Sequence, residues 1–184
     1  MSQASKLGLI KEMLESAESN LRSAKQMLNE LTGFSAKNIY TKMAAELSEP
    51  EKEDESTIVE GVFNGQTMID KNKKEYSVPA NYASKSKLVP GDVLKLTIKE
   101  DGSFLYKQIG PTERKRIIGI LTFEDGQYKV IANGKAYKVL LASVTYFKAE
   151  VGDKITLVIP ELEESEWGAI ENVLPKDTEE LALE

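Results

Sequence analysis

Two short stretches of the chain decide its fold. They are Pro90-Gly-Asp-Val-Leu-Lys-Leu-Thr-Ile98 and Val151-Gly-Asp-Lys-Ile-Thr-Leu-Val-Ile159, and each places Gly-Asp directly before an apolar run. A shift of 61 positions without a gap aligns them, and the same shift carries Gly65-Gln66 onto Gly126-Gln127 and Tyr76 onto Tyr137. So many matches in one register indicate an internal duplication.

The residues around these stretches have the pattern of β-strands separated by turns. In the first copy we expect strands at 58–63, 67–70, 75–79, 93–98 and 104–109, with Gly, Asn and Asp between them. Glycine permits backbone angles that other residues avoid, and aspartate accepts backbone N–H bonds across a turn. We therefore interpret four residues as structural turns: Gly91, Asp92, Gly152 and Asp153.

The N-terminal part has a helical pattern. Its apolar residues alternate at spacings of three and four, which is the a/d seam of a coiled coil: Leu7, Ile10, Leu14, Ala17, Leu21, Ala24, Leu28 and Leu31. Gly33 is a suitable C-terminal cap, and Ser35 is suited to open a second helix. An isolated helix of this length is marginal in water, so the seam needs a partner. We favour a homo-oligomer, most simply a dimer; the alternative is a hairpin with the second helix or docking onto the β region.

Changes in charge indicate where the parts of the chain meet. Residues 46–60 carry one basic and seven acidic side chains, whereas residues 61–118 carry 11 basic and 6 acidic ones. We expect a helical oligomerisation segment at 1–47, a solvated acidic linker at 48–56, a basic β repeat at 57–112, an acidic β repeat at 113–175 and an acidic tail at 176–184.

The expected fold class is α+β, with a coiled-coil-like helical segment followed by a duplicated, mostly antiparallel β-barrel region that has an internal pseudo-twofold repeat. Two arrangements fit this expectation. The copies either interleave into one barrel or stand as two small five-stranded barrels in tandem. We favour interleaving, because a unit of roughly 50 residues is marginal alone.

The layout of each copy resembles a known motif. A strand, a polar crossover, Gly-Asp, an alternating strand, a turn and a last strand follow one another, with Val78-Pro79 and Gly91-Asp92 as the best matches; the second copy has Val139-Leu140 where the proline would stand. This resembles the GD-box of cradle-loop barrels, particularly the swapped-hairpin barrels of AbrB-type transition-state regulators and antitoxins. The resemblance implies that two units interleave.

A second resemblance covers residues 57–174. Stretches such as Tyr106-Lys-Gln-Ile-Gly-Pro111 and Arg114-Lys-Arg116 are similar to an uncharacterised family from candidate-phyla bacteria, some members of which carry a label as ribosomal stalk proteins. This resemblance implies a bacterial, ribosome-associated protein. With no long apolar run in the chain, we expect a cytoplasmic location and no membrane partner.

Composition argues against an enzyme. The chain has no Cys and no His, so it lacks thiolate and imidazole metal ligands and the usual nucleophile–base pairs. No glycine-rich phosphate loop is present, and no carboxylate pair lies in an apolar context suited to acid–base catalysis. Carboxylate ligation of a metal at Asp92 or Asp153 is disfavoured because the turn role explains both. We expect no catalytic residue, no metal and no cofactor.

The basic first repeat suggests a binding function. Its cations lie in sequence among aromatic residues, the combination that nucleic-acid sites use for phosphates and bases. The candidate contacts are Lys71, Lys73, Lys74, Tyr82, Lys85, Lys87, Lys107, Arg114, Lys115 and Arg116. Tyr76 recurs as Tyr137 and is better explained as core, whereas Tyr82 has Ser143 as its counterpart and is the better exposed contact.

Two functions follow from these observations. The first is a non-catalytic protein that binds nucleic acid or a ribonucleoprotein such as the ribosome through the basic repeat. The second is a homo-oligomeric adaptor that presents a protein-binding β surface. Trp167, the single tryptophan, fits a buried ring at the end of the second repeat better than an exposed hot spot.

Overall fold

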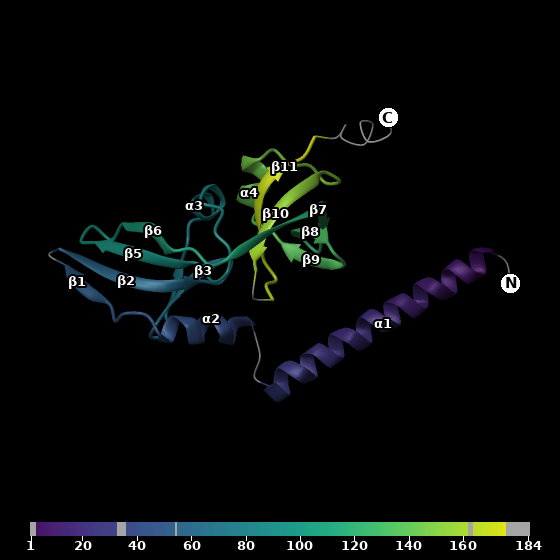
Figure 1. The fold of residues 1–184 in the computed structure, drawn as a ribbon, viewed down its shortest axis with the longest axis horizontal. Helices are drawn as coiled ribbons and strands as arrows, with labels where there is room; N and C mark the ends of the chain where they lie inside the picture. Colours follow the sequence, from purple (N-terminus) through teal and green to yellow (C-terminus); the bar gives the residue numbers. More distant parts are fainter. Residues whose placement is uncertain (1–2, 33–35, 54, 162–163, 176–184) are drawn as a thin grey trace. The chain divides into compact units, whose positions relative to one another are not determined.

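The computed structural model describes residues 3–32, 36–53, 55–161 and 164–175. The chain is mixed α and β, with four helices and two antiparallel sheets in this part (Figure 1). It divides into two units, residues 1–39 and residues 40–184, so the second helix is shared between them. The division does not fall in the acidic segment 48–56, part of which forms strand β1 (Glu51–Glu53).

The first unit is dominated by one helix, α1 (Gln3–Thr32), as the heptad pattern predicts. Its seam side chains from Leu7 to Ala24 are exposed, including Leu14 and Leu21 at more than 60%. The side chains of Leu28 and Leu31, and the whole of Gly33 and Ser35, lie outside the described part of the chain. Helix α2 (Ala36–Ala45) follows, and its residues Tyr40 and Ala44 are buried in the second unit.

The first repeat forms a sheet of its own around strand β2 (Ser56–Phe63). Its other strands are β3 (Thr67–Asp70), β4 (Glu75–Ser77), β5 (Val93–Lys99) and β6 (Phe104–Gly110), and the order is β4-β3-β2-β5-β6 with β1 paired to β2. Helix α3 (Ala80–Lys85) connects β4 to β5. These strands fall where the alternating pattern of the sequence predicts them.

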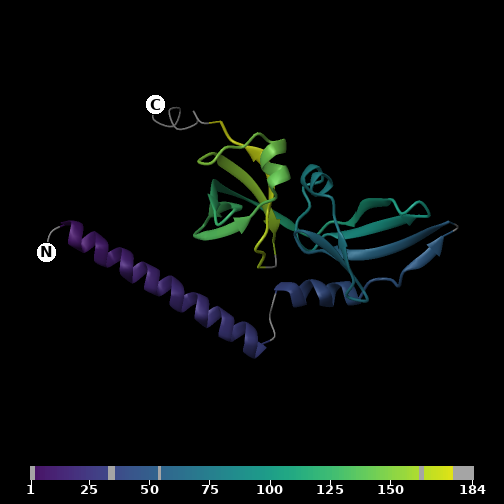
Figure 2. The same ribbon diagram turned by 180° about the vertical axis from the view of Figure 1, so that it is seen from behind.

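The second repeat builds the same topology. Its elements are β7 (Arg114–Glu124), β8 (Gln127–Ala132), β9 (Lys135–Lys138), α4 (Leu141–Tyr146), β10 (Lys154–Pro160) and β11 (Ala169–Val173). The strand order, β11-β10-β7-β8-β9, is that of the first sheet read from the other edge, and α4 occupies the place of α3 (Figure 2). The duplication in sequence is therefore a duplication of structure.

Interleaving, the favoured expectation, is wrong. Among the described strands, each pairs only within its own repeat, and the ladders form two sheets rather than one fused barrel. Each repeat encloses a separate apolar core, and a small third cluster of Val89, Val158 and Ala169 packs where the repeats meet. Two separate cores remove the need for strand exchange, because each sheet already buries its own apolar face.

Equivalent residues of the two repeats have equivalent environments. Gly91 and Gly152 both have φ of +95°, and the carboxylates of Asp92 and Asp153 accept the backbone N–H of Val89 and Glu150 at 2.9 and 2.8 Å. In both repeats the Gly-Asp pair thus has the same backbone conformation and the same hydrogen bond. Tyr76 and Tyr137 are both buried, with Lys74 and Lys135 at 5.0 and 5.2 Å from their ring centroids, which confirms the core interpretation of Tyr76.

The repeats differ in their first hairpin. Phe63 donates its N–H to the Asp92 carbonyl, and Leu121 donates its N–H to the Asp153 carbonyl. Phe63 and Leu121 thus have the same role, although they are 58 rather than 61 positions apart. Strand β7 therefore continues three residues further before its turn than β2 does. The ungapped shift holds only from that turn onward.

Trp167 lies half-buried against the first repeat. A single bridge joins it to Lys138, tying the edge strand β9 to the segment that leads into β11. Its ring covers Gly65, where a Cβ atom would lie 2.5 Å from Trp167 Cγ. The glycine is thus required both by its φ of +116° and by the indole above it.

We predict that Gly65→Ala destabilises the fold by roughly 1–3 kcal/mol more than Gly126→Ala, its counterpart in the second repeat. Both substitutions place alanine at a positive φ, but a Cβ at Gly126 meets nothing within 4 Å. Urea unfolding followed by Trp167 fluorescence measures the difference. Equal losses of stability in the two variants would contradict this prediction, because they would show that the Trp167 ring moves aside at no cost in stability.

Candidate ligand groove between the two repeats

Helices α3 and α4 bring the two repeats together. They lie in contact within the second unit, and Ser84 and Ser143 meet between them through their hydroxyls at 2.9 Å, both 2% exposed. Two residues separate each helix from the end of the preceding strand, the second of them being Pro79 or Leu140, and each helix is six residues long. The short helices are thus held by the strands on either side rather than by their own length.

An open groove with a volume of about 1020 Å³ lies beside these helices. Its lining comes from both repeats: Gln66, Ala80, Asn81, Lys85, Phe123, Gly126, Gln127, Tyr128, Val139, Leu140, Leu141, Ala142, Thr145, Tyr146 and Trp167. Four equivalent pairs face it, at positions 66 and 127, 80 and 141, 81 and 142, and 85 and 146. The groove is therefore lined by equivalent positions of both repeats.

The groove is rich in aromatic surface. Phe123 and Tyr128 are tilted against each other at 4.7 Å between ring centroids, and Tyr146 packs edge-on against Phe147 at 4.9 Å. Phe123 and Tyr146 nevertheless keep more than half of their surface exposed. Lys85 is the single charged residue among the lining residues described, so the groove combines flat apolar faces with one cation.

Phe123 and Tyr146 are not among the contacts predicted from the sequence. Both lie where the second repeat departs from the first: Tyr146 replaces Lys85, and Phe123 belongs to the longer first hairpin. Departures from the repeat are the signal that could have found them. Tyr82, chosen by that reasoning as an exposed contact, is half-buried and stacks on Tyr106 at 6.0 Å between centroids.

Both of the predicted arginine contacts are engaged within the protein. Arg114 reaches the fully buried Asp92 carboxylate at 2.6 Å and donates to the Lys87 carbonyl at 3.1 Å. Arg116 holds Glu171 through two bonds of 2.6 and 2.9 Å, and this hydrogen bonding lowers the pKa of the Glu171 carboxyl. Both arginines therefore form ion pairs within the protein, and a phosphate would have to compete with Asp92 or Glu171 for them.

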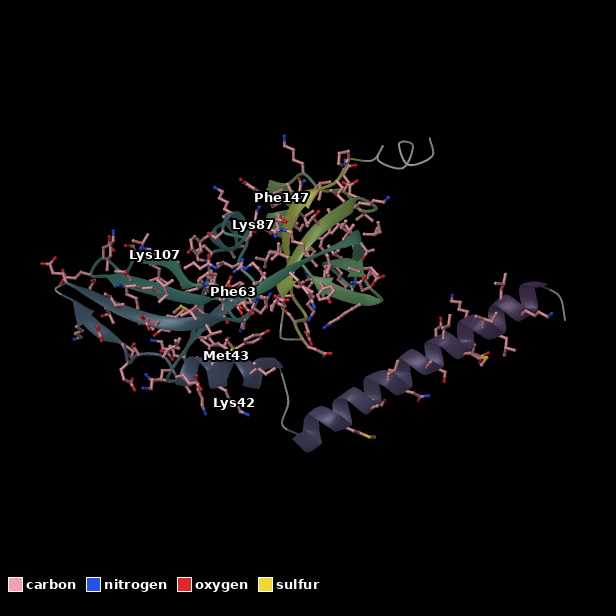
Figure 3. All side chains as sticks on the ribbon, in the orientation of Figure 1. Lys42, Met43, Phe63, Lys87, Lys107 and Phe147 are labelled. Carbon is pink, nitrogen blue, oxygen red and sulfur yellow. The ribbon has the colours of Figure 1, made fainter. Side chains whose placement is uncertain are left out.

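The remaining candidates are spread over several elements. Lys71 pairs with Glu49 at 3.2 Å, and Lys73 and Lys74 lie in and after the β3–β4 turn. Lys115 is exposed on β7, and Lys107 is exposed on β6, on the sheet of the first repeat and apart from Lys87 (Figure 3). The structure therefore does not gather the ten predicted residues at one place; it brings Lys85 to the groove and leaves the others outside it.

The Asp92 carboxylate is fully buried. Burial raises the pKa of the Asp92 carboxyl, although the backbone N–H groups of Val89 and Thr112 and the Arg114 guanidinium oppose that rise. The three donors satisfy the carboxylate at 2.9, 3.0 and 2.6 Å. Through these three bonds the carboxylate joins the Val89 turn, the connection at Thr112 and the start of β7.

Comparison with protein-family models and with curated proteins found no match. In the part of the chain that was searched, no group of three or more His, Cys, Asp or Glu side chains is placed to hold a metal ion. None of the described helices is long and apolar enough to cross a membrane.

We predict that Arg114→Met destabilises the second unit by about 3 kcal/mol at pH 7, because it leaves a buried carboxylate without its counterion. Arg116→Met is the matched control and costs below about 1 kcal/mol, since its side chain is exposed. When folding raises the pKa of a carboxyl, the folded protein becomes less stable as pH rises through that pKa, because the buried group must then become charged. The Arg114→Met deficit is therefore larger at pH 7 than at pH 5. Denaturant titrations at both pH values test this, and an equal deficit contradicts it.

Proposed function

We propose that this chain is a cytoplasmic, non-catalytic binding protein whose inter-repeat groove takes single-stranded nucleic acid, free or within a ribonucleoprotein such as the ribosome. The observation that supports this most is the groove lining, which includes the exposed rings of Phe123 and Tyr146 and the cationic side chain of Lys85. Aromatic faces that stack bases, together with cations for the backbone, are the usual means of binding single strands.

The distribution of charge refines the proposal. The sequence alone placed both cations and aromatic rings in the first repeat. In the structure the exposed rings of the groove belong to the second repeat and its cation to the first, so a bound strand would contact both. With one cation in the lining, we expect modest affinity supported mainly by stacking.

An adaptor function is the second candidate, supported by a different surface. Ile118, Ile120 and Ile131 lie on neighbouring strands, with Ile120 directly opposite Ile131, and are between 37% and 60% exposed. An apolar group of this kind on a sheet face is typical of protein contacts. This surface and the groove have no residue in common.

We predict that Tyr146→Ala weakens binding of a labelled single-stranded oligonucleotide by about 5- to 150-fold, which corresponds to the roughly 1–3 kcal/mol of one stacked base. Lys85→Glu weakens it too and lowers the slope of log K against log salt by about 0.7 for the lost phosphate contact. Fluorescence anisotropy with uridylate and deoxythymidylate probes of about 12 nucleotides measures both.

The matched controls are Phe104→Ala and Lys107→Glu, an exposed ring and an exposed cation outside the groove. We expect them to leave affinity within about twofold of the parent, near the 0.5 kcal/mol scatter of surface substitutions. If Lys107→Glu matters as much as Lys85→Glu, the ligand follows the basic repeat and not the groove. If the parent binds neither probe at low salt, the adaptor function replaces this proposal.

A further inference from the structure

We infer that α1 is the pairing surface for a second copy of this chain and that the two helices run antiparallel. The inference extends the expected oligomerisation with a direction, and it does not depend on what the groove binds. It rests on the exposed seam of α1 and on the sizes of the residues in that seam.

The seam is exposed although it is apolar. Leu7, Ile10, Leu14 and Leu21 are all more than half exposed, and they lie on one stripe of a 30-residue helix. The flanking Met13 and Met27 are 64% and 62% exposed. A helix with such a stripe is stabilised chiefly by packing against a partner, and heptad spacing is the pattern of a helical partner.

The seam of one α1 matches the seam of a second α1 that runs in the opposite direction. Its a positions are Leu7, Leu14, Leu21 and Leu28, and its d positions are Ile10, Ala17, Ala24 and Leu31. With a twofold axis at residue 19, Leu14 lies opposite Ala24 of the second copy, Ala17 opposite Leu21, Ile10 opposite Leu28 and Leu7 opposite Leu31. All eight seam positions then have partners, and no part of the stripe overhangs.

Size decides between the two directions. A parallel pair would alternate leucine against leucine with alanine against alanine, so Leu14 layers would hold the helices apart while Ala17 layers left a gap. The antiparallel pair puts one large and one small residue in each of the four central layers, so one spacing fits those four layers. The ends, where Ile10 and Leu7 meet leucines, are wider and close the pair on both sides.

The residues on either side of the seam favour the antiparallel direction in part. Antiparallel pairing brings Met13 next to Met27 of the second copy, which covers two exposed methionines, whereas parallel pairing would set Met13 beside a glutamate position. It also brings Lys11 near Lys25 of the second copy, a like-charge contact at the surface. A parallel pair has its own such contact, between Lys6 and Lys11. Exposed contacts of this kind cost only a few tenths of a kcal/mol, so core packing determines the direction.

The direction has a functional consequence. The chain continues from the C-terminal end of each α1. In an antiparallel pair the two chains therefore continue from opposite ends of the paired stretch, which runs from Leu7 to Leu31 and is about 36 Å long at 1.5 Å per residue. Such a dimer carries two grooves, one on each chain.

Disulfide trapping tests the direction, and the natural absence of cysteine makes it specific. Leu14→Cys and Ala24→Cys are made separately in the full chain, one of them lengthened by a tag, then mixed and equilibrated in a thiol–disulfide buffer. We expect linked dimers that contain one chain of each kind and almost none of either kind alone, because only facing residues bring Cα atoms within the 4.4–6.8 Å that a disulfide needs. Ser16→Cys, on the outer face, controls for collision.

Three results overturn the inference. They are self-linked dimers of Leu14→Cys alone, which indicate a parallel pair; no linkage above the Ser16→Cys control; and sedimentation of the parent chain as a monomer at high micromolar concentration. A second mixture, Ala17→Cys with Leu21→Cys, repeats the test in case Leu14→Cys weakens the seam. None of these readouts involves a ligand, so failure here leaves the groove proposal untouched, and failure of oligonucleotide binding leaves this inference untouched.

Discussion

The buried carboxylate of Asp92 is the constraint on which the arrangement of the two repeats depends. It accepts N–H bonds from the turn at Val89, from Thr112 in the connection to the second repeat, and from Arg114 at the start of β7. A buried carboxylate is costly unless every one of these donors is in place, so the three segments are fixed together or not at all. The path by which the chain enters the second sheet is thereby set, and with it the groove that both repeats line.

Because of the duplication, equivalent positions of the two repeats line the groove, and differences between the repeats give its two sides different chemistry. Positions 85 and 146 are equivalent and both line it, yet one is a lysine and the other a tyrosine. Where the repeats stay alike, as at Tyr76 and Tyr137 or at the Gly-Asp turns, the shared residues are buried and structural. Where they differ beside the groove, as at Lys85 and Tyr146, the residues are exposed. The two glutamines at positions 66 and 127 are alike and also line the groove, so its two sides share some chemistry and differ at positions such as 85 and 146.

Much of the fold could be predicted from the sequence, because strands, turns and the α1 seam are recorded in local patterns and in the 61-residue shift. Which strands pair across the repeats is not recorded there, since an alternating strand fits either its own sheet or its twin's, and interleaving was the wrong choice. The candidate site was harder still. Arg114 and Arg116 look like free cations in sequence, but their carboxylate partners are 22 and 55 positions away. The exposure of Phe123 and Tyr146 likewise depends on packing and not on local pattern.

The proposed groove and the proposed direction of pairing fit together through affinity. A groove with one cation and a few rings binds a single strand modestly, because most phosphate contacts are missing. Two such grooves on one dimer change that, because the second contact is made within the complex at an effective concentration set by the span between sites. A ligand long enough to contact both grooves would therefore bind a dimer more tightly than a ligand that fills only one.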